Sequence, residues 1–343
     1  MKIDVLYEFG EKHIAAAGVS ILSLLENNRD FEEIRIYILG DVLSRESEDR
    51  LRTLVAKYRR QLTFLDRERL LHILKKLKLP AYRGQFSFDL RMYLSLILDA
   101  DVKRLLYLQV NTIIVSGLMG LIDMDLEGHP AAMVLDALVR KHKRQLGFAR
   151  DDYYYNAGVI LFDMQAWRRE RCTERIINHI KNVRARYPLP EQDLLNVVLK
   201  GEILKLYPEY SMQPVLRIFS EKNYRKVFSL RGFYTEEELS RAEEAPVIFL
   251  SSRFAGEYPW HKGNVHPDND LFNRYLTESP WSGYVKKKAR RGLVFRIEKL
   301  LYRRVPEQLF IRLFRAAYER SIRRANSDSL KNGSRKDYIW DRL

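Results

Sequence analysis

Short apolar runs alternate with longer amphipathic segments through most of the chain. Runs rich in Val, Ile and Leu predict buried strands, and apolar residues repeated every three or four positions predict helices. The strands expected on this basis are residues 5–7, 34–39, 62–64, 105–108, 131–135, 158–162 and 247–250. The expected helices are residues 15–25, 46–58, 89–98, 167–186 and 191–200. This alternation predicts an α/β fold with a Rossmann-like, mostly parallel central sheet and helices on both faces.

A different pattern begins near residue 285. Residues 293–302 and 309–318 place apolar side chains at three-to-four spacing among Arg and Lys, which predicts basic amphipathic helices. Residues 326–343 are polar and have no period, so we expect them to fray. We therefore divide the chain into a main α/β domain, residues 1–284, and a basic helical tail, residues 285–343.

The charge distribution supports this division. The formal net charge is +15, and residues 285–343 alone carry 18 Lys and Arg against 6 Asp and Glu. Such a tail is expected to meet an anionic membrane surface or a partner. Aromatic residues at helical spacing favour an interfacial helix over nucleic acid, for which we find no module. These aromatics are Phe295, Tyr302, Phe310, Phe314 and Tyr318. The alternative is a tail that only covers the flank of the main domain.

Composition excludes several other classes of protein. No apolar run approaches the roughly 18–20 residues needed to cross a bilayer. The N-terminus begins directly as a strand and shows no signal peptide. Cys172 is the only cysteine, so intrachain disulfides and Cys-based zinc sites are excluded, and we expect it to pack as a small apolar group. We expect a cytoplasmic protein held peripherally at the inner face of the cell membrane.

Several polar motifs occur in a fixed order between the apolar runs. They are Gly18-Val-Ser-Ile-Leu-Ser-Leu-Leu-Glu-Asn-Asn28, Arg104-Leu-Leu-Tyr-Leu-Gln-Val-Asn-Thr-Ile-Ile-Val115, Tyr154-Tyr-Asn-Ala-Gly-Val-Ile-Leu-Phe-Asp163, Glu191-Gln-Asp-Leu-Leu-Asn196, Tyr258-Pro-Trp260 and Pro280-Trp281. In this order they resemble glycosyltransferase family 8, over roughly residues 1–282. That family comprises retaining enzymes of the GT-A fold, among them bacterial lipopolysaccharide galactosyl- and glucosyltransferases and glycogenin. The resemblance implies transfer of a hexose from a UDP-sugar to a glycolipid or cell-surface glycan precursor.

The residues that face the sugar in this family carry over well. The family's Asn-Ala-Gly turn, which contacts the transferred sugar, matches Asn156-Ala157-Gly158. An earlier family Asp that binds sugar hydroxyls matches Asp136. The family's Asp-Gln-Asp motif reads Glu191-Gln192-Asp193 and would place Gln192 at the reacting face. An Arg before the central strand matches Arg91. Asn156 could instead serve only its turn, and Gln192 only a helix surface.

The residues that would hold a metal ion do not carry over. After the central strand the family has Asp-x-Asp, which binds a divalent cation, but this chain has the neutral amides Gln109 and Asn111. The family's late metal-binding His is missing from residues 247–254. Hard cations prefer anionic oxygen ligands, so we expect no metal and regard Mn²⁺ as doubtful.

The phosphate and nucleotide contacts also depart from the family. The family's diphosphate-binding Lys is replaced by Tyr258, so we expect Lys12, Arg253 and Lys262 to provide positive charge, unless they are only solvated loop charges. The loop that binds the nucleotide in this family follows Glu8 in this chain. His13 is the one side chain of this loop with a ring that could stack on uracil.

Other motifs are interpreted more simply. Asp99-Ala-Asp101 and Asp123-Met-Asp125 do not follow strands and are interpreted as surface turns. His261 and His266 lie in a Pro- and Gly-containing loop, where loop or acceptor-site roles are favoured over metal binding.

Three functions remain open at this stage. The first is a metal-free transferase, acting alone, as a homodimer or with a partner transferase. The second is a catalytically inactive family 8 homologue that acts as an accessory or partner-binding subunit. The third is a peripheral lipid-binding module. The retained sugar-side motifs favour the first, and the altered nucleotide loop favours the second.

Overall fold

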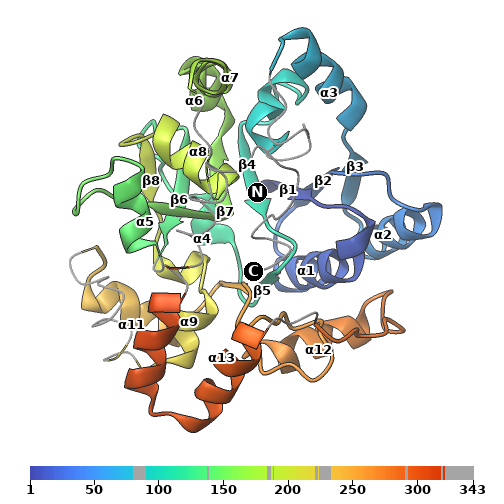
Figure 1. Cartoon of the computed structure of the whole chain (residues 1–343). Helices are drawn as coiled ribbons and strands as arrows, with labels where there is room; N and C mark the ends of the chain where they lie inside the picture. The colour runs from blue at the N-terminus through green and yellow to red at the C-terminus, as the bar shows by residue number, and fades with distance from the viewer. Residues whose placement is uncertain are drawn as a thin grey trace.

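The computed structural model describes residues 1–79, 90–136, 139–183, 187, 189–220, 223, 233–289, 293–317 and 320. These residues form an α/β fold around a seven-stranded sheet of order β3-β2-β1-β4-β7-β6-β8 (Figure 1). The strands are β1 (Lys2–Glu8), β2 (Glu33–Leu39), β3 (Gln61–Phe64), β4 (Arg104–Leu108), β6 (Ala131–Leu135), β7 (Tyr155–Asp163) and β8 (Ile203–Lys205). The expected fold class is confirmed, although the short β8 was not predicted.

The sheet is mostly parallel, with one reversed strand. β1 pairs in parallel with β2 and β4, β2 with β3, and β6 with β8. Only β7 runs antiparallel to both of its neighbours, β4 and β6. The carboxyl ends of β1, β4 and β6 therefore meet the beginning of β7 at one edge of the sheet, where ligands of such sheets bind.

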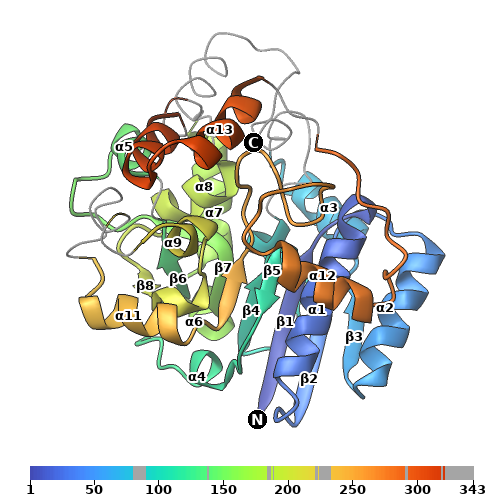
Figure 2. The same cartoon turned by 90° about the horizontal axis from the view of Figure 1, so that it is seen from below.

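Helices cover both faces of the sheet, which explains why its central strands are continuous apolar runs. One face carries α1 (Ile14–Asn27), α2 (Arg45–Lys57) and α12 (Asn269–Glu278). The other carries α3 (Arg67–Lys76), η2 (Leu90–Leu96), α6 (Met164–Arg169) and α7 (Cys172–Asn182) (Figure 2). Cys172 is buried at the start of α7, as expected of a packed small side chain, and burial raises the pKa of its thiol to about 12.

Two of the sequence motifs serve packing. Gly18 lies in α1 beneath Trp281, and a Cβ atom at residue 18 would come within 2.2 Å of the indole ring. Asn27 ends the same helix and donates a hydrogen bond of 2.9 Å to the Tyr275 hydroxyl of α12. These contacts hold α12 against α1, so this part of the family pattern is structural.

Two predicted helices differ from the observed ones. The single helix expected over residues 167–186 is wrong, because Arg171 adopts a left-handed conformation (φ 53°) and separates α6 from α7. The Trp167 indole donates to the Thr173 hydroxyl across this break at 2.9 Å, which fixes the turn. The helix expected over residues 89–98 is a 3₁₀ helix, η2, and Asp89 lies outside the described residues.

A second, two-stranded sheet lies beside the carboxyl edge of the main one. It pairs β5 (Thr112–Ile114) with β9 (Ile248–Leu250) in antiparallel fashion. The Ser251 amide donates to the Asn111 carbonyl at 2.8 Å, just beyond this pairing. The segment after β9 is thereby placed beside Gln109 and Asn111, although about 140 residues separate them in sequence. The remaining elements are η1 (Glu11–His13), α4 (Met119–Ile122), α5 (Arg140–Gln145), α8 (Pro190–Val198), η3 (Pro208–Tyr210), α9 (Pro214–Ile218) and α11 (Glu236–Glu244).

The C-terminal region forms α13 (Leu293–Arg304) and a further helix over residues 307–317, which together we call the C-terminal helix pair. Pro306 separates them, since proline ends one helix and suits the first turn of the next. In Figure 2 the start of β1 lies at the bottom and α13 at the top, so the pair lies toward the carboxyl ends of the parallel strands. No helix in the described ranges has both the length and the apolar character required to cross a membrane.

The aromatic residues of the helix pair pack against the main domain. The ring of Phe254 contacts those of Tyr302, Phe310 and Phe314, at centroid distances of 4.9, 6.3 and 6.1 Å. The sequence-based interpretation of these aromatics as membrane-facing is therefore wrong, because they complete the core. Tyr318 and residues 326–343 lie outside the described residues.

Candidate functional site

A pocket of about 180 Å³ lies at the carboxyl edge of the sheet. Its walls include residues that the sequence singled out from five separate segments: Gln109, Asn111, Asp136, Asn156, Ala157, Gly158, Glu191, Gln192 and Arg253. The fold therefore brings most of the candidate site together. Glu8, Lys12, His13, Arg91 and Lys262 are not among the lining residues.

Asp136, Asn156 and Gln192 form a hydrogen-bonded group that we call the sugar cluster. Asp136 Oδ2 accepts hydrogen bonds from Asn156 Nδ2 at 3.1 Å and from Gln192 Nε2 at 2.9 Å. Gln192 Oε1 in turn accepts the Ala157 amide at 3.1 Å, and Asn156 Oδ1 accepts the Gly158 amide at 2.9 Å. This network assigns the orientation of both side-chain amides and fixes all three residues against the pocket wall.

Backbone geometry at the start of β7 explains how the cluster forms. The pairing of β6 with β7 shifts register between Met133 and Leu135, and such irregularities redirect the side chains that follow, here Asp136. Gly158 passes close beneath β9, where a Cβ atom would come within 2.8 Å of the Leu250 methyl groups. A larger residue at this position of the Asn-Ala-Gly motif would therefore displace the Leu250 side chain.

The corner formed by Gln109, Asn111 and Arg253 lies on another wall of the same pocket. The Asn111 side chain is buried, and its Oδ1 has no hydrogen-bond partner within the described part of the chain. The same holds for Arg253 Nε, while the Arg253 guanidinium stacks over the Phe295 ring at 4.6 Å. Burial lowers the pKa of Arg253 from its ordinary value, but a guanidinium stays charged at neutral pH.

This corner does not fit the divalent cation that the family resemblance implies. Its oxygen donors are two neutral amides and the hydroxyls of the segment after β9, with no carboxylate among them. Over the residues that the structure describes, no group of three or more His, Cys, Asp or Glu side chains is placed to share a metal ion. We therefore derive no step of the reaction through a metal.

Arg91 connects two of the elements that form the site. Its side chain is almost fully buried, with Nη1 3.0 Å from Glu8 Oε2 and Nη2 2.6 Å from Glu191 Oε2. The guanidinium also lies over the Tyr107 ring of β4 at 4.4 Å. Arg91 thus ties the end of β1 to the first turn of α8, the turn that carries Gln192.

The nucleotide loop lies outside the set of residues that line the pocket, and its side chains have other contacts. Glu11 accepts hydrogen bonds from Ser44 and Ser47 at the start of α2, which lowers the pKa of its carboxyl although burial opposes this. Lys12 is exposed. Burial and the charge of Lys12 lower the pKa of His13 from its ordinary value.

The loop after β9 contains the remaining candidates. Lys262 is exposed, and Tyr258, which replaces the family's Lys, stacks on Trp260 at 4.4 Å. His266 is buried, and its Nε2 lies 2.8 Å from the Ser252 carbonyl, next to Arg253. His261 Nδ1 accepts the Tyr258 amide at 3.0 Å. Both histidines thus make hydrogen bonds that stabilise the conformation of this loop.

Neither of the additional Asp-x-Asp strings lies at the pocket. Asp101 sits at the opposite end of β4, where its Oδ2 is 2.8 Å from Arg35 Nη1. Asp125 accepts the Glu127 amide at 2.8 Å in an exposed turn. Their interpretation as surface turns agrees with these contacts.

Sequence reasoning missed one whole wall of the pocket. Phe295, Glu298, Phe314 and Ala317 of the C-terminal helix pair line it, together with Gln213 and Tyr258 of the main domain. One signal was available in the sequence. Glu298 shares the helical face of Phe295 and Tyr302, and an acid on the aromatic face of a basic helix is unusual.

Comparison with known proteins decides the family. The profile described as Glycosyl transferase family 8 matches residues 4–231, well over half of the chain. The chain belongs to glycosyltransferase family 8. This family 8 protein is 26% identical over 305 residues to a lipopolysaccharide 1,2-glucosyltransferase of Escherichia coli K12, covering 86% of this chain and 83% of that protein. It is 23% identical over 282 residues to general stress protein A of Bacillus subtilis, covering 79% and 91%.

A solved structure supports the fold of this family 8 protein. The galactosyltransferase LgtC, in complex with donor and acceptor sugar analogues, superimposes with a TM-score of 0.62 at 19% identity, covering 82% of this chain and 99% of that one. At this identity the likeness shows the fold alone, and the expected GT-A fold is confirmed. Family membership supports sugar transfer as the general activity.

Proposed function

We propose that this family 8 protein transfers a hexose from a UDP-sugar, with retention, to a glycolipid or cell-surface glycan precursor, and that it does so without a divalent cation. One observation carries the proposal: the sugar cluster lines the same pocket as a corner that contains two amides and the half-buried Arg253. Relatives named for glucosyl and galactosyl transfer support a hexose as the transferred group.

The sugar cluster supplies the donor-sugar side of the reaction. Asp136 offers a negatively charged acceptor for sugar hydroxyls, held in place by two amide donors. The Gln192 carbonyl is fixed by the Ala157 amide, so its dipole is already oriented before the substrate binds. A fixed dipole and a nearby carboxylate stabilise the positive charge that develops on the sugar ring as the diphosphate leaves.

Arg253 supplies the diphosphate side. Retention requires the leaving group and the acceptor oxygen to share one face of the sugar, so the departing negative charge must be stabilised inside the pocket. A guanidinium binds phosphate oxygens through two parallel hydrogen bonds and stays charged when buried. Arg253 meets these needs because it lines the pocket and has a donor with no partner among the described residues. Lys262, by contrast, is exposed and is not among the lining residues of the pocket.

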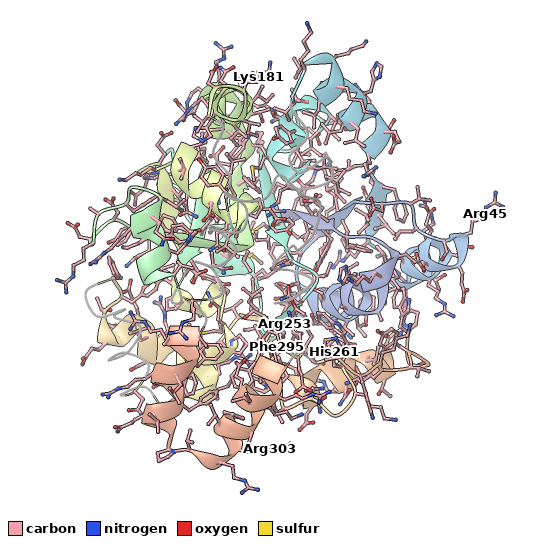
Figure 3. The ribbon with its side chains drawn as sticks, in the orientation of Figure 1. Arg45, Lys181, Arg253, His261, Phe295 and Arg303 are labelled. Atoms are coloured by element: carbon pink, nitrogen blue, oxygen red, sulfur yellow. The ribbon has the colours of Figure 1, made fainter. Side chains whose placement is uncertain are left out.

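The outer face of the C-terminal helix pair supports an anionic membrane surface as partner, and hence a peripheral location at the inner face of the membrane. Ile297, Leu300, Leu309 and Leu313 are 48%, 55%, 48% and 42% exposed. The exposed Arg303, Arg304 and Arg312 lie on the same two helices. Figure 3 shows Arg303 pointing away from the domain. Basic and apolar side chains in one exposed face are suited to the headgroup region of an anionic bilayer.

The nucleotide loop favours a second candidate function, that of a catalytically inactive accessory subunit. Glu11 is held by Ser44 and Ser47, and no residue of the η1 turn lines the pocket. A protein of this kind would keep the fold and a partner surface without turning over a nucleotide sugar.

Substitution of the sugar cluster separates the two candidates. In a transferase, Asp136→Asn should lower the release of UDP from UDP-glucose or UDP-galactose by about 30- to 150-fold, because a charge-assisted hydrogen bond is worth about 2–3 kcal/mol. UDP affinity should fall far less, since UDP lacks the sugar. Asp123→Asn, an exposed substitution outside the pocket, is the control. A wild-type protein that binds no UDP-sugar and releases no UDP would support the accessory subunit instead.

A further inference from the structure

The C-terminal helix pair forms one wall of the sugar pocket. Phe295 and Glu298 of α13 line the cavity, as do Phe314 and Ala317 of the following helix. The other contributions come from the sugar cluster and from the corner formed by Gln109, Asn111 and Arg253. The region that composition marked as a tail is thus part of the site itself.

Glu298 is the one acidic side chain that this wall contributes among the described residues. It lies between the rings of Phe295 and Tyr302 along the helix. Burial raises the pKa of its carboxyl to about 7, against a hydrogen bond with the Ala255 backbone and the charge of Arg253, both of which lower it. Besides these two interactions, the Glu298 side chain lines the cavity, where a ligand can reach it.

The position of Glu298 is fixed by contacts on both sides of it. Its neighbour Lys299 reaches the fully buried Glu257 at 3.1 Å and donates to the Gly263 carbonyl at 2.8 Å. One turn earlier, Phe295 packs so closely on Gly256 that a Cβ atom there would come within 2.6 Å of the ring. Gly256 also has a φ of +74°, which glycine adopts without strain. The C-terminal helix pair is therefore packed tightly against the main domain at this wall.

We propose that this wall binds the acceptor sugar, with Glu298 accepting hydrogen bonds from its hydroxyl groups. This inference rests on the proposed function and names the acceptor side of that site. The sugar cluster accounts for the donor sugar and Arg253 for the diphosphate, which leaves the helix pair as the wall without an assigned ligand. A carboxylate next to aromatic rings suits a sugar, because hydroxyls bind the carboxylate and the apolar faces of the ring pack on the aromatics.

The outer face of the same helices explains why the acceptor would arrive here. Leu300 and Leu309 are exposed on the side that would meet a membrane, while Phe295 and Phe314 line the pocket on the inner side. A sugar attached to a lipid would then pass from the bilayer to the pocket along one structural element.

The test compares Glu298→Gln with Glu278→Gln, a matched substitution on an exposed part of α12. Acceptor probes are octyl β-glucoside, octyl β-galactoside and octyl β-lactoside, and donor probes are UDP-glucose and UDP-galactose. Saturation-transfer NMR on the full chain with UDP present measures glycoside binding. Assays of transfer to the glycoside and of donor hydrolysis by water measure the two half-sites separately.

We expect Glu298→Gln to raise the KM for the glycoside by about tenfold or more, as loss of a charge-assisted hydrogen bond predicts. Its effect on kcat, and on hydrolysis of the donor by water, should be several times smaller. Glu298→Asp should recover part of the acceptor affinity, whereas Glu278→Gln should behave as wild type. Equal losses in hydrolysis and transfer, an unchanged KM, or no glycoside binding by a wild-type protein that hydrolyses donor would each overturn the inference.

Failure of the proposed function looks different. In that case the wild-type protein neither binds UDP nor hydrolyses either donor. Glycoside binding that depends on Glu298 would still support the acceptor wall in a binding protein. Its absence would overturn that assignment as well.

Discussion

The charges around the pocket are arranged so that a diphosphate can approach despite several acids. Glu191 is paired with Arg91, and Asp136 is hydrogen-bonded by two amides. The raised pKa of Glu298, about 7, means that this carboxyl carries only part of its charge near neutral pH. Arg253 thus contributes a positive charge near three acids, of which one is paired, one is hydrogen-bonded and one is partly protonated.

The titration of Glu298 predicts a pH-dependent stability. Its folded pKa of about 7 is above the ordinary value of 4.5, so the folded protein holds the proton more tightly than the unfolded chain. Stability from this group is fully present below about pH 4.5 and is lost as the pH rises through 7. Glu298→Gln cannot titrate, so its advantage over wild type should grow by up to about 3 kcal/mol between pH 5 and pH 8.

Urea unfolding at the two pH values, with Glu278→Gln as control, measures this difference. A gap between wild type and Glu298→Gln that is the same at both pH values would show that the carboxyl titrates normally.

Whether a site residue could be predicted depended on the sequence motif around it. Asp136, Asn156 and Gln192 were found because the motifs around them match those of glycosyltransferase family 8. Glu298 was not, because which face of an amphipathic helix meets which part of a domain is decided by tertiary packing. Lys262 was included on charge alone, and charge does not say where a loop points.

At the scale of elements, α13 and the loop that bears Arg253 form one unit. Lys299 of α13 pairs with Glu257, which is completely buried, and removing one charged member of a buried pair destabilises the charge that remains. Lys299→Met should therefore lower the free energy of unfolding by about 3 kcal/mol or more. It should also weaken donor binding through displacement of Arg253.

The double variant Lys299→Met/Glu257→Gln is the matched test, because it removes both charges and should recover much of the stability. Lys288→Met, in an exposed position just before α13, controls for loss of a lysine. Thermal unfolding of the three variants decides the point. A Lys299→Met protein that melts with the wild type would mean that the two elements are independent.

Periodicity predicted the elements that form the two layers, and its failures have identifiable causes. The break between α6 and α7 depends on Arg171 in a left-handed conformation, which no apolar pattern marks. β8 has only three residues, too few to show a period. The β5–β9 pairing joins segments that are remote in sequence, so periodicity alone does not place the segment after β9 beside Asn111.

At the scale of the whole molecule, the C-terminal helix pair has two faces with different proposed roles. The inner face lines the pocket, and the outer face exposes arginine and leucine side chains. The proposed membrane contact therefore depends on the outward aliphatic residues and arginines. The aromatic residues to which the sequence pointed are packed against the domain.

Vesicle flotation tests this membrane contact. Arg303→Gln/Arg304→Gln should weaken partitioning onto phosphatidylglycerol vesicles about 30-fold, since each basic residue near an anionic surface is worth about 1 kcal/mol. Partitioning of the wild type should also fall at high salt. Arg45→Gln/Lys181→Gln removes the same charge from distant surfaces and is the control (Figure 3). Equal flotation of both double variants would contradict the assignment of this face.

The claim on which the account depends is that Arg253 does the work that a divalent ion does in related sites. Calorimetric titration of UDP into the full chain, once with Mn²⁺ and once with EDTA, measures this directly. We expect the same Kd within about twofold in both buffers. Arg253→Gln should raise the Kd about tenfold or more, whereas Arg274→Gln, at an exposed position of α12, should not. Binding that requires Mn²⁺ and disappears with EDTA, with Arg253→Gln unaffected, would contradict it.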